Sequence, residues 1–127
     1  MSYKNIAHDR YNDGSDISCR AVATITGKTF VAYSGDLKDG LISVATATAG
    51  EPVAGVAKYD AKAGNNVGVA RGSARVITIT AGADLTAGTK IQVGESGKAV
   101  PAVDGDIVGF AVAPAAADTD ALISLAY

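Results

Sequence analysis

Few residues in this chain have the chemistry and spacing of a catalytic or ligand site. The 127-residue sequence contains one cysteine, Cys19, and one histidine, His8. A cysteine nucleophile needs a base to accept its proton, and the eleven-position separation of His8 and Cys19 fits no catalytic pattern. The sequence therefore predicts a buried, structural Cys19. His8 has no companion residue for a metal site.

Three short segments match ligand-binding motifs only in part. The run Asp104-Gly105-Asp106 matches a fragment of a calcium loop but lacks the other ligands and the terminal glutamate. The segments 50–55 and 64–68 contain glycines but lack the lysine, the hydroxyl and the following helix of a phosphate-binding loop. We expect turns at all three places. The sequence predicts no cofactor, no metal ion and no catalytic residue.

Charge and hydropathy exclude two classes of partner. The net charge is −2, the isoelectric point is near 5.2, and no run of lysine or arginine occurs, so we expect no direct nucleic-acid binding. No stretch approaches the roughly 20 apolar residues of a membrane span, so we expect no membrane contact. A single cysteine and a start without a signal region fit a protein made in a reducing cytoplasm.

Residues 1–20 differ from the rest of the chain. They are polar and lack sustained periodicity, which predicts an extended N-terminal arm ahead of a single β domain at 21–127. Tyr3, Ile6 and Tyr11 are nevertheless larger and more apolar than a free tail requires. Two interpretations stay open: the arm packs as a strand on its own domain, or it docks on a partner.

The remainder of the chain has the pattern of an all-β protein. Short apolar or alternating segments separated by glycine predict a β-sandwich or a small β-barrel. Alanine is abundant, but no apolar stripe at helical spacing accompanies it, so helix content should be low. The expected strands are 20–25, 29–33, 41–45, 53–59, 66–70, 74–80, 90–93, 98–100, 107–113 and 121–126.

The second half of the chain echoes the first, in the same order. Segment 26–35 is echoed by 87–97, with 61 positions between Gly27 and Gly88. Segment 53–64 is echoed by 107–118, with 54 positions between Gly55 and Gly109. Such an internal pseudo-repeat indicates one β unit used twice, and two copies are too few for a solenoid.

Three segments carry a resemblance to a known family. They are 51–72 (EPVAGVAKYDAKAGNNVGVARG), 80–93 (TAGADLTAGTKIQV) and the closing GFAV of 109–112, followed by an alanine-rich turn and the ISL of 123–125. Over roughly residues 20–127 the chain resembles the small capsid decoration, or cement, proteins of tailed bacteriophages. In size and composition it is similar to lambda-type head decoration proteins.

The resemblance implies both a fold and a role. The fold would be a β-tulip or a related β-barrel, and the protein would be a homotrimer on the exterior of the virion capsid. There it would bind the major capsid protein and stabilise the expanded head. In lambda-type proteins an N-terminal arm becomes ordered on the capsid, so the candidate contacts here are Tyr3, Ile6, Arg10 and Tyr11.

Other hypotheses stay open beside this one. A carbohydrate- or host-surface-binding β module on a virion would use exposed aromatic side chains, for which Tyr33, Tyr59 and Tyr127 are the candidates in the folded part. An enzyme is a third hypothesis, which lacks an acid–base pair. A major shell subunit or a tail component is a fourth.

Overall fold

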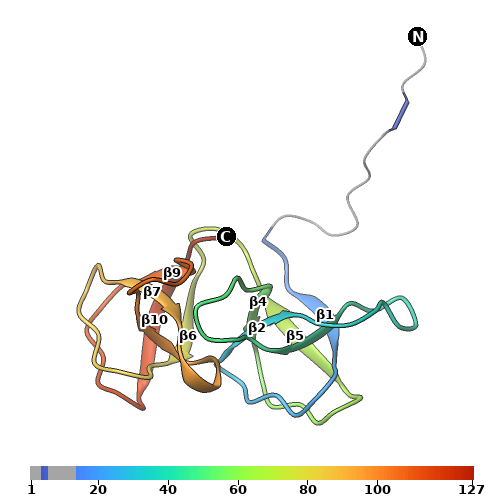
Figure 1. Ribbon diagram of the computed structural model, residues 1–127, viewed down its shortest axis with the longest axis horizontal. Coiled ribbons are helices and arrows are strands. Elements are labelled where there is room, and N and C mark those ends of the chain that lie inside the picture. The colour runs from blue at the N-terminus through green and yellow to red at the C-terminus, as the bar shows by residue number, and fades with distance from the viewer. Residues whose placement is uncertain (1–3, 6–13) are drawn as a thin grey trace.

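Figure 1 shows the computed structural model, which describes residues 4–5 and 14–127. Within these residues the chain forms ten strands and one 3₁₀ turn, which confirms the predicted all-β class. The strands are β1 (Ile17–Ala21), β2 (Phe30–Tyr33), β3 (Ser43–Thr46), β4 (Gly55–Ala57), β5 (Asn66–Ala70), β6 (Val76–Thr80), β7 (Lys90–Val93), β8 (Ala99–Pro101), β9 (Gly109–Ala111) and β10 (Asp120–Leu125). The 3₁₀ turn, η1, is Glu95–Gly97.

The first five strands close into a barrel. Their order is β1-β3-β2-β4-β5, and β5 pairs back onto β1. All neighbours are antiparallel except β1 and β3, which run parallel. Strand alternation turns Cys19 of β1 and Val67 of β5 into the interior, where both are fully buried. The prediction of a buried Cys19 is therefore confirmed.

The last five strands form a second sheet with the same order. Its strands are arranged in the order β6-β10-β9-β7-β8. The first barrel gives the equivalent order, β1-β5-β4-β2-β3, when its strands are followed from β1 to its neighbour β5 and onward round the barrel. The parallel contact that closes the first barrel between β1 and β3 recurs here only as a single bridge between Ala81 and Ala99. The second sheet is therefore a more open copy of the first barrel.

Strand register shows that the two halves match residue by residue. Val31 of β2 lies opposite Gly55 of β4, and Ile91 of β7 lies opposite Gly109 of β9. In the same way, the pairing of β1 with β5 in the first barrel corresponds to the pairing of β6 with β10 in the second sheet. The predicted pseudo-repeat is thus a repeat of hydrogen-bonded pairs as well as of residue types.

The number of positions between equivalent residues of the first repeated block is one smaller in the structure than the number obtained by aligning glycines in the sequence. Lys28 and Gly88 are equivalent, because their N–H groups donate to the carbonyls of Ala57 and Ala111 in the same way. The first block is therefore offset by 60 positions, not the 61 that separate Gly27 and Gly88. Both turn residues have positive φ, 61° at Lys28 and 83° at Gly88. Aligning glycines misplaced the block because Lys28 adopts a conformation that glycine usually takes.

The interiors of the two halves contain equivalent side chains. The inner cluster of the first barrel is Ile17, Cys19, Ala21, Ile25, Val31, Val44, Ala54, Ala57, Ala61, Val67 and Val69. Their counterparts in the second sheet are Ile77, Ile79, Ala81, Leu85, Ile91, Ala99, Val108, Ala111, Ala115, Ala121 and Ile123, all packed in one cluster. Small and β-branched residues fill both, because a five-stranded barrel leaves little internal space.

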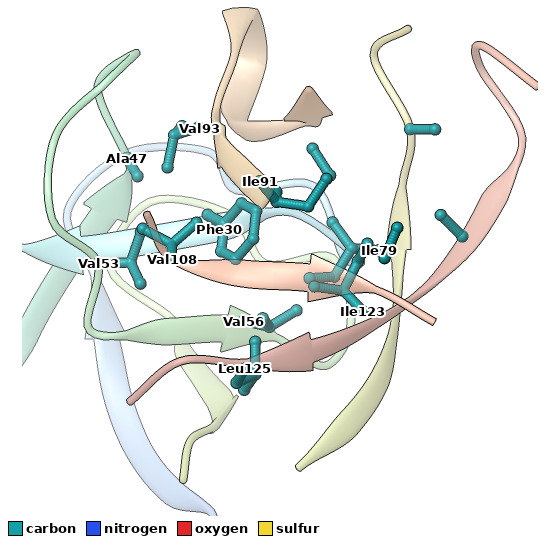
Figure 2. Packing of buried hydrophobic residues seen from close by; sticks show 14 of the residues in the cluster. Phe30, Ala47, Val53, Val56, Ile79, Ile91, Val93, Val108, Ile123 and Leu125 are labelled. Atoms are coloured by element: carbon teal, nitrogen blue, oxygen red, sulfur yellow. The ribbon is translucent and has the colours of Figure 1, made fainter. Parts of the chain in front are cut away.

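The first barrel closes the more open second sheet. Phe30, Val53 and Val56 belong to the first barrel but pack in the cluster of the second sheet, and Figure 2 shows the Phe30 ring beside Val108. The Thr80 N–H of β6 donates to the Lys28 carbonyl at 2.9 Å across the junction. The two halves therefore share one continuous core, as residues of a single folding unit do.

The start of the first strand differs from its predicted position. β1 begins at Ile17 and pairs with β5 from that residue, so positions 17–20 belong to the barrel and not to the arm expected over 1–20. The alternation of β1 includes a polar residue in most outward positions, which made the segment resemble the polar arm in sequence.

Candidate functional site

The candidate contact residues Tyr3, Ile6, Arg10 and Tyr11 lie outside the described residues, as does His8. The structure describes instead the point at which the N-terminal segment joins the folded body. This point lies between the two halves, beside the segment 71–75 that links β5 to β6.

A cluster of charges fixes the chain at this junction. One carboxylate oxygen of Asp16 accepts a hydrogen bond from Nη1 of Arg75 at 2.5 Å, and the other accepts from Nζ of Lys58 at 3.2 Å. Nη1 of Arg75 also lies 3.4 Å from the carbonyl oxygen of Gly14. We call Asp16, Lys58 and Arg75 the arm anchor. It joins the start of the described body to both halves of the molecule.

The charges of the arm anchor alter the acidity of Asp16. The hydrogen bond from Arg75 holds the pKa of the Asp16 carboxyl below its ordinary value, and Lys58 adds to this effect while burial opposes it. The carboxylate is therefore ionised throughout the neutral range.

The backbone also brings the segment 71–75 close to the start of the described body. Gly72 has a φ of 128°, and a Cβ built there would lie 2.9 Å from the Cα of Gly14. A side chain at position 72 would push the two segments apart. The segment 71–75 therefore supports the start of the described body.

A hollow with two tyrosines adjoins this support. Its volume is about 440 Å³, and its lining residues are Tyr33, Val53, Ala54, Arg71, Gly72, Ser73 and Tyr127. Tyr33 is 62% exposed and Tyr127 is 46% exposed. The Val53 N–H donates to the Tyr127 hydroxyl oxygen at 3.0 Å, which orients that ring. Two aromatic faces are thus available next to the arm anchor.

Of the three tyrosines expected for sugar binding, the structure brings two together. Tyr33 and Tyr127 share the hollow, whereas Tyr59 lies on the first barrel, with its ring over Gly68. The sequence could not group Tyr33 with Tyr127, because 94 positions separate them. Their proximity depends on the packing of the C-terminal residues against the segment before β4.

The remaining candidate motifs have structural roles. Asp104 and Asp106 flank a turn in which the side-chain oxygen of Gln92 accepts from the N–H groups of Val103 and Gly105, each at 2.9 Å. Burial raises the pKa of the Cys19 thiol, so the thiol is the predominant form at neutral pH. Within residues 4–5 and 14–127, no cluster of three metal-ligating side chains occurs. Among the same residues, no helix is long and apolar enough to span a bilayer.

These features define a structural β module: a closed barrel and a more open copy of it that share a core, with a charge cluster where the N-terminal segment joins the body. The chain belongs to the phage cement protein family, whose profile matches residues 10–125. This is a family of structural phage proteins, so the chain is a capsid-associated component of the virion. The family resemblance drawn from the sequence is therefore confirmed.

Comparison with solved structures supports the fold. The chain is similar to the head fiber gp8.5 N base of bacteriophage phi29, with a TM-score of 0.74 and 24% sequence identity. The alignment covers 87% of this chain and 92% of the phi29 chain. A search of curated proteins gives no match.

Proposed function

We propose that this protein is a cement protein that binds the outer surface of a bacteriophage capsid, contacts the major capsid protein and stabilises the expanded head. It would be made in the host cytoplasm and act as a homotrimer on the capsid. The single observation that carries this proposal is the arm anchor, which attaches an N-terminal segment rich in tyrosine to a stiff body.

In this proposal the N-terminal segment makes the contact with the shell, and the folded body holds the base of that segment. An extended segment that docks on the shell gains main-chain hydrogen bonds and side-chain contacts, but its ordering costs about 2–5 kcal/mol. Asp16 reduces the freedom of the segment at its base, because Arg75 and Lys58 both hold it. Three copies in a trimer would bind together at high effective concentration, so weak individual contacts would suffice.

The test is binding to capsids that lack the protein. Replacing Tyr3, Ile6, Arg10 and Tyr11 by alanine should abolish co-sedimentation with expanded heads and lower the temperature at which the heads release DNA. A matched variant with alanine at Ser2, Asn5 and Asn12 should bind like the wild type. Wild-type binding by the quadruple alanine variant would show that these four side chains do not make the contact; if a variant that lacks residues 2–13 also binds like the wild type, the capsid-binding surface lies on the body.

The hollow favours a second candidate function, binding of a carbohydrate on the host surface. Tyr33 and Tyr127 present two ring faces beside Arg71, and sugars stack on such faces. A glycan array should then give hits that Tyr33→Ala removes. Tyr59→Ala, which changes an exposed tyrosine outside the hollow, should leave them unchanged. An array without hits for the wild type would exclude this function.

A further inference from the structure

The duplication provides an internal comparison of solvent-exposed surfaces. Equivalent positions on the outer faces of the two halves have equal places in the fold, so the residue types at these positions can be compared directly. Three such pairs are Asp16 with Val76, Lys58 with Val112, and Gly68 with Leu122, as the strand registers and the shared hydrogen-bond pattern place them. The first barrel has charged or small residues where the second sheet has apolar ones.

These apolar residues are exposed on the neighbouring strands β6 and β10 and at the end of β9. Val76 is 52% exposed, Val112 is 47% exposed and Leu122 is 46% exposed. Leu122 and Val112 are neighbours across the β10–β9 contact, since the Val112 N–H donates to the Leu122 carbonyl at 2.9 Å. Phe110, which lies opposite Ser124 on the next rung, is also exposed. We call Val76, Phe110, Val112 and Leu122 the apolar face.

A groove with excess positive charge borders the apolar face at Val76. It is about 220 Å³ in volume and lies between Lys28, Ala57 and Lys58 of the first barrel and residues 75–78 of the second sheet. Lys28 pairs with Asp120 at 3.0 Å, and Asp16 is shared between Lys58 and Arg75. The chain as a whole has a net charge of −2, so this cluster of three cations with two carboxylates is a local exception.

The first barrel carries a projection of complementary character. The connection from β2 to β3 spans 34–42, whereas its counterpart from β7 to β8 spans only 94–98. The longer connection forms a small hairpin closed by reciprocal hydrogen bonds between Lys38 and Leu41, with Asp39 and Gly40 both at positive φ. Two such residues make the tight turn that suits a β-hairpin. We call 35–41 the projecting hairpin.

The projecting hairpin presents an apolar side chain beside two acidic ones and one basic one. Leu37 is 59% exposed; Asp36 precedes it, and Lys38 and Asp39 follow it, so the hairpin has a net charge of −1. The hairpin is held in place at its base, where the Ser43 hydroxyl donates to the Asp36 carbonyl at 2.8 Å. Its leucine matches the apolar face, and its carboxylates match the cations of the bordering groove.

The hairpin and the apolar face of one chain do not meet. In Figure 1 the hairpin between β2 and β3 extends at the end of the long axis away from β9 and β10. A contact between them must therefore join two copies. We propose that the projecting hairpin of one copy docks on the apolar face of the next, in a head-to-tail contact that closes into a ring. Such heterologous contacts form rings when the rotation between copies closes. This inference rests on the proposed self-association and is independent of the capsid contact.

Disulfide trapping tests the contact directly. The wild-type chain has one thiol, Cys19, which is fully buried and will not interfere. The double variant Leu37→Cys, Leu122→Cys should form disulfide-linked multimers under mild oxidation, both free in solution and on decorated heads. A mixture of the two single variants should give only linked dimers that contain one of each. The matched control is Leu37→Cys, Val103→Cys, which pairs the hairpin with an exposed position outside the apolar face and should stay unlinked.

Each result decides for or against the contact. Specific 37–122 links, with no links in the control, support it. Absence of these links both in solution and on heads overturns it, as does linking of Leu122→Cys with itself, which would indicate a two-fold contact of apolar faces. A further variant, Leu122→Asp, should remain folded by circular dichroism and sediment as a smaller species. If it loses head binding while its oligomeric state is unchanged, the apolar face contacts the capsid protein and the proposal is wrong.

Discussion

At the scale of single residues, the two glycines Gly55 and Gly109 are required by close contacts in β4 and β9. An ideal Cβ at Gly55 would overlap the carbonyl oxygen of Ala70, and one at Gly109 would lie 2.8 Å from the carbonyl oxygen of Ser124. Ala70 and Ser124 are themselves equivalent positions. The glycine echo that marks the repeat in the sequence therefore has a steric cause in both halves.

Replacing either glycine by alanine should destabilise the protein. We expect Gly55→Ala and Gly109→Ala each to lower the free energy of unfolding by about 1–3 kcal/mol, because the added methyl displaces a neighbouring strand. Gly64→Asn is the control: Gly64 has a φ of 86°, and its counterpart Asp118 already has a φ of 62°. Urea unfolding gives the comparison. Equal stability of Gly55→Ala and the wild type would contradict the steric explanation.

Asp16 should make attachment of the N-terminal segment sensitive to acid. Its pKa in the folded state is lowered, so the ionised carboxylate stabilises the fold above the ordinary carboxyl pKa, and this contribution is lost as the pH falls through the lowered pKa. Titration by NMR should show a pKa for Asp16 below the ordinary range in the wild type. In Arg75→Gln it should shift upward, since Arg75 is the larger cause. A titration identical in both proteins would remove Arg75 from the anchor.

The sequence indicated some of these residue roles and missed others. The burial of Cys19 was predicted from the absence of a suitable catalytic base in the sequence. The role of Asp16 did not, because Lys58 and Arg75 lie 42 and 59 positions away and only the fold brings them to it. Charges so far apart in the chain give no local signal.

At the scale of elements, β2 joins the two halves of the molecule. Its side chains alternate between two interiors: Val31 packs inside the first barrel, while Phe30 packs in the cluster of the second sheet. The equivalent strand β7 has Ile91 inside, but Lys90 stands exposed in the place of Phe30. The outward side of β2 therefore packs against the other half of the molecule, whereas the equivalent side of β7 faces solvent.

Truncating Phe30 should test this junction. We expect Phe30→Ala to lower the free energy of unfolding by about 3–5 kcal/mol, because the lost ring leaves a cavity between the halves. Lys90→Ala, at the equivalent exposed position, should change it by about 0.5 kcal/mol or less. Chemical denaturation measures both. A small effect of Phe30→Ala would mean that the halves do not depend on each other for stability.

Every predicted strand has a counterpart in the structure, because apolar alternation and glycine turns are local signals. The ends differ by a few residues, most of all at β1, which begins at Ile17 and not at position 20. Pairing with β5 decides where β1 begins, and pairing partners are not visible in the strand's own sequence. The difference between a sandwich and a closed barrel has the same origin.

At the scale of the whole molecule, the shared core makes the two halves one unit. The cluster that fills the second sheet includes Phe30, Val53 and Val56 of the first barrel. The second sheet lacks the continuous seam of the first barrel, with only Ala81 and Ala99 bridging its edge strands. It should therefore depend on the first barrel for its interior.

We expect the protein to unfold in one cooperative transition. In calorimetry the measured and van't Hoff enthalpies should agree, since neither half can lose its structure without exposing the shared cluster. A fragment of residues 72–127 should lack the dispersed NMR spectrum of a folded protein. Two separate transitions, or a folded 72–127 fragment, would show that the halves are independent domains.

The sequence by itself determined the all-β class, the duplication and the absence of a recognisable catalytic motif, because each depends on residue types at short spacing. It also carried the family resemblance that the comparison with known proteins confirmed. Only the tertiary structure decided that the repeat is a closed barrel and a more open sheet sharing a core, that Asp16 anchors the N-terminal segment, and that Tyr33 and Tyr127 share a hollow. The physical reason is the same for all three: they are contacts between segments far apart in the chain, and strand pairing and packing bring them together.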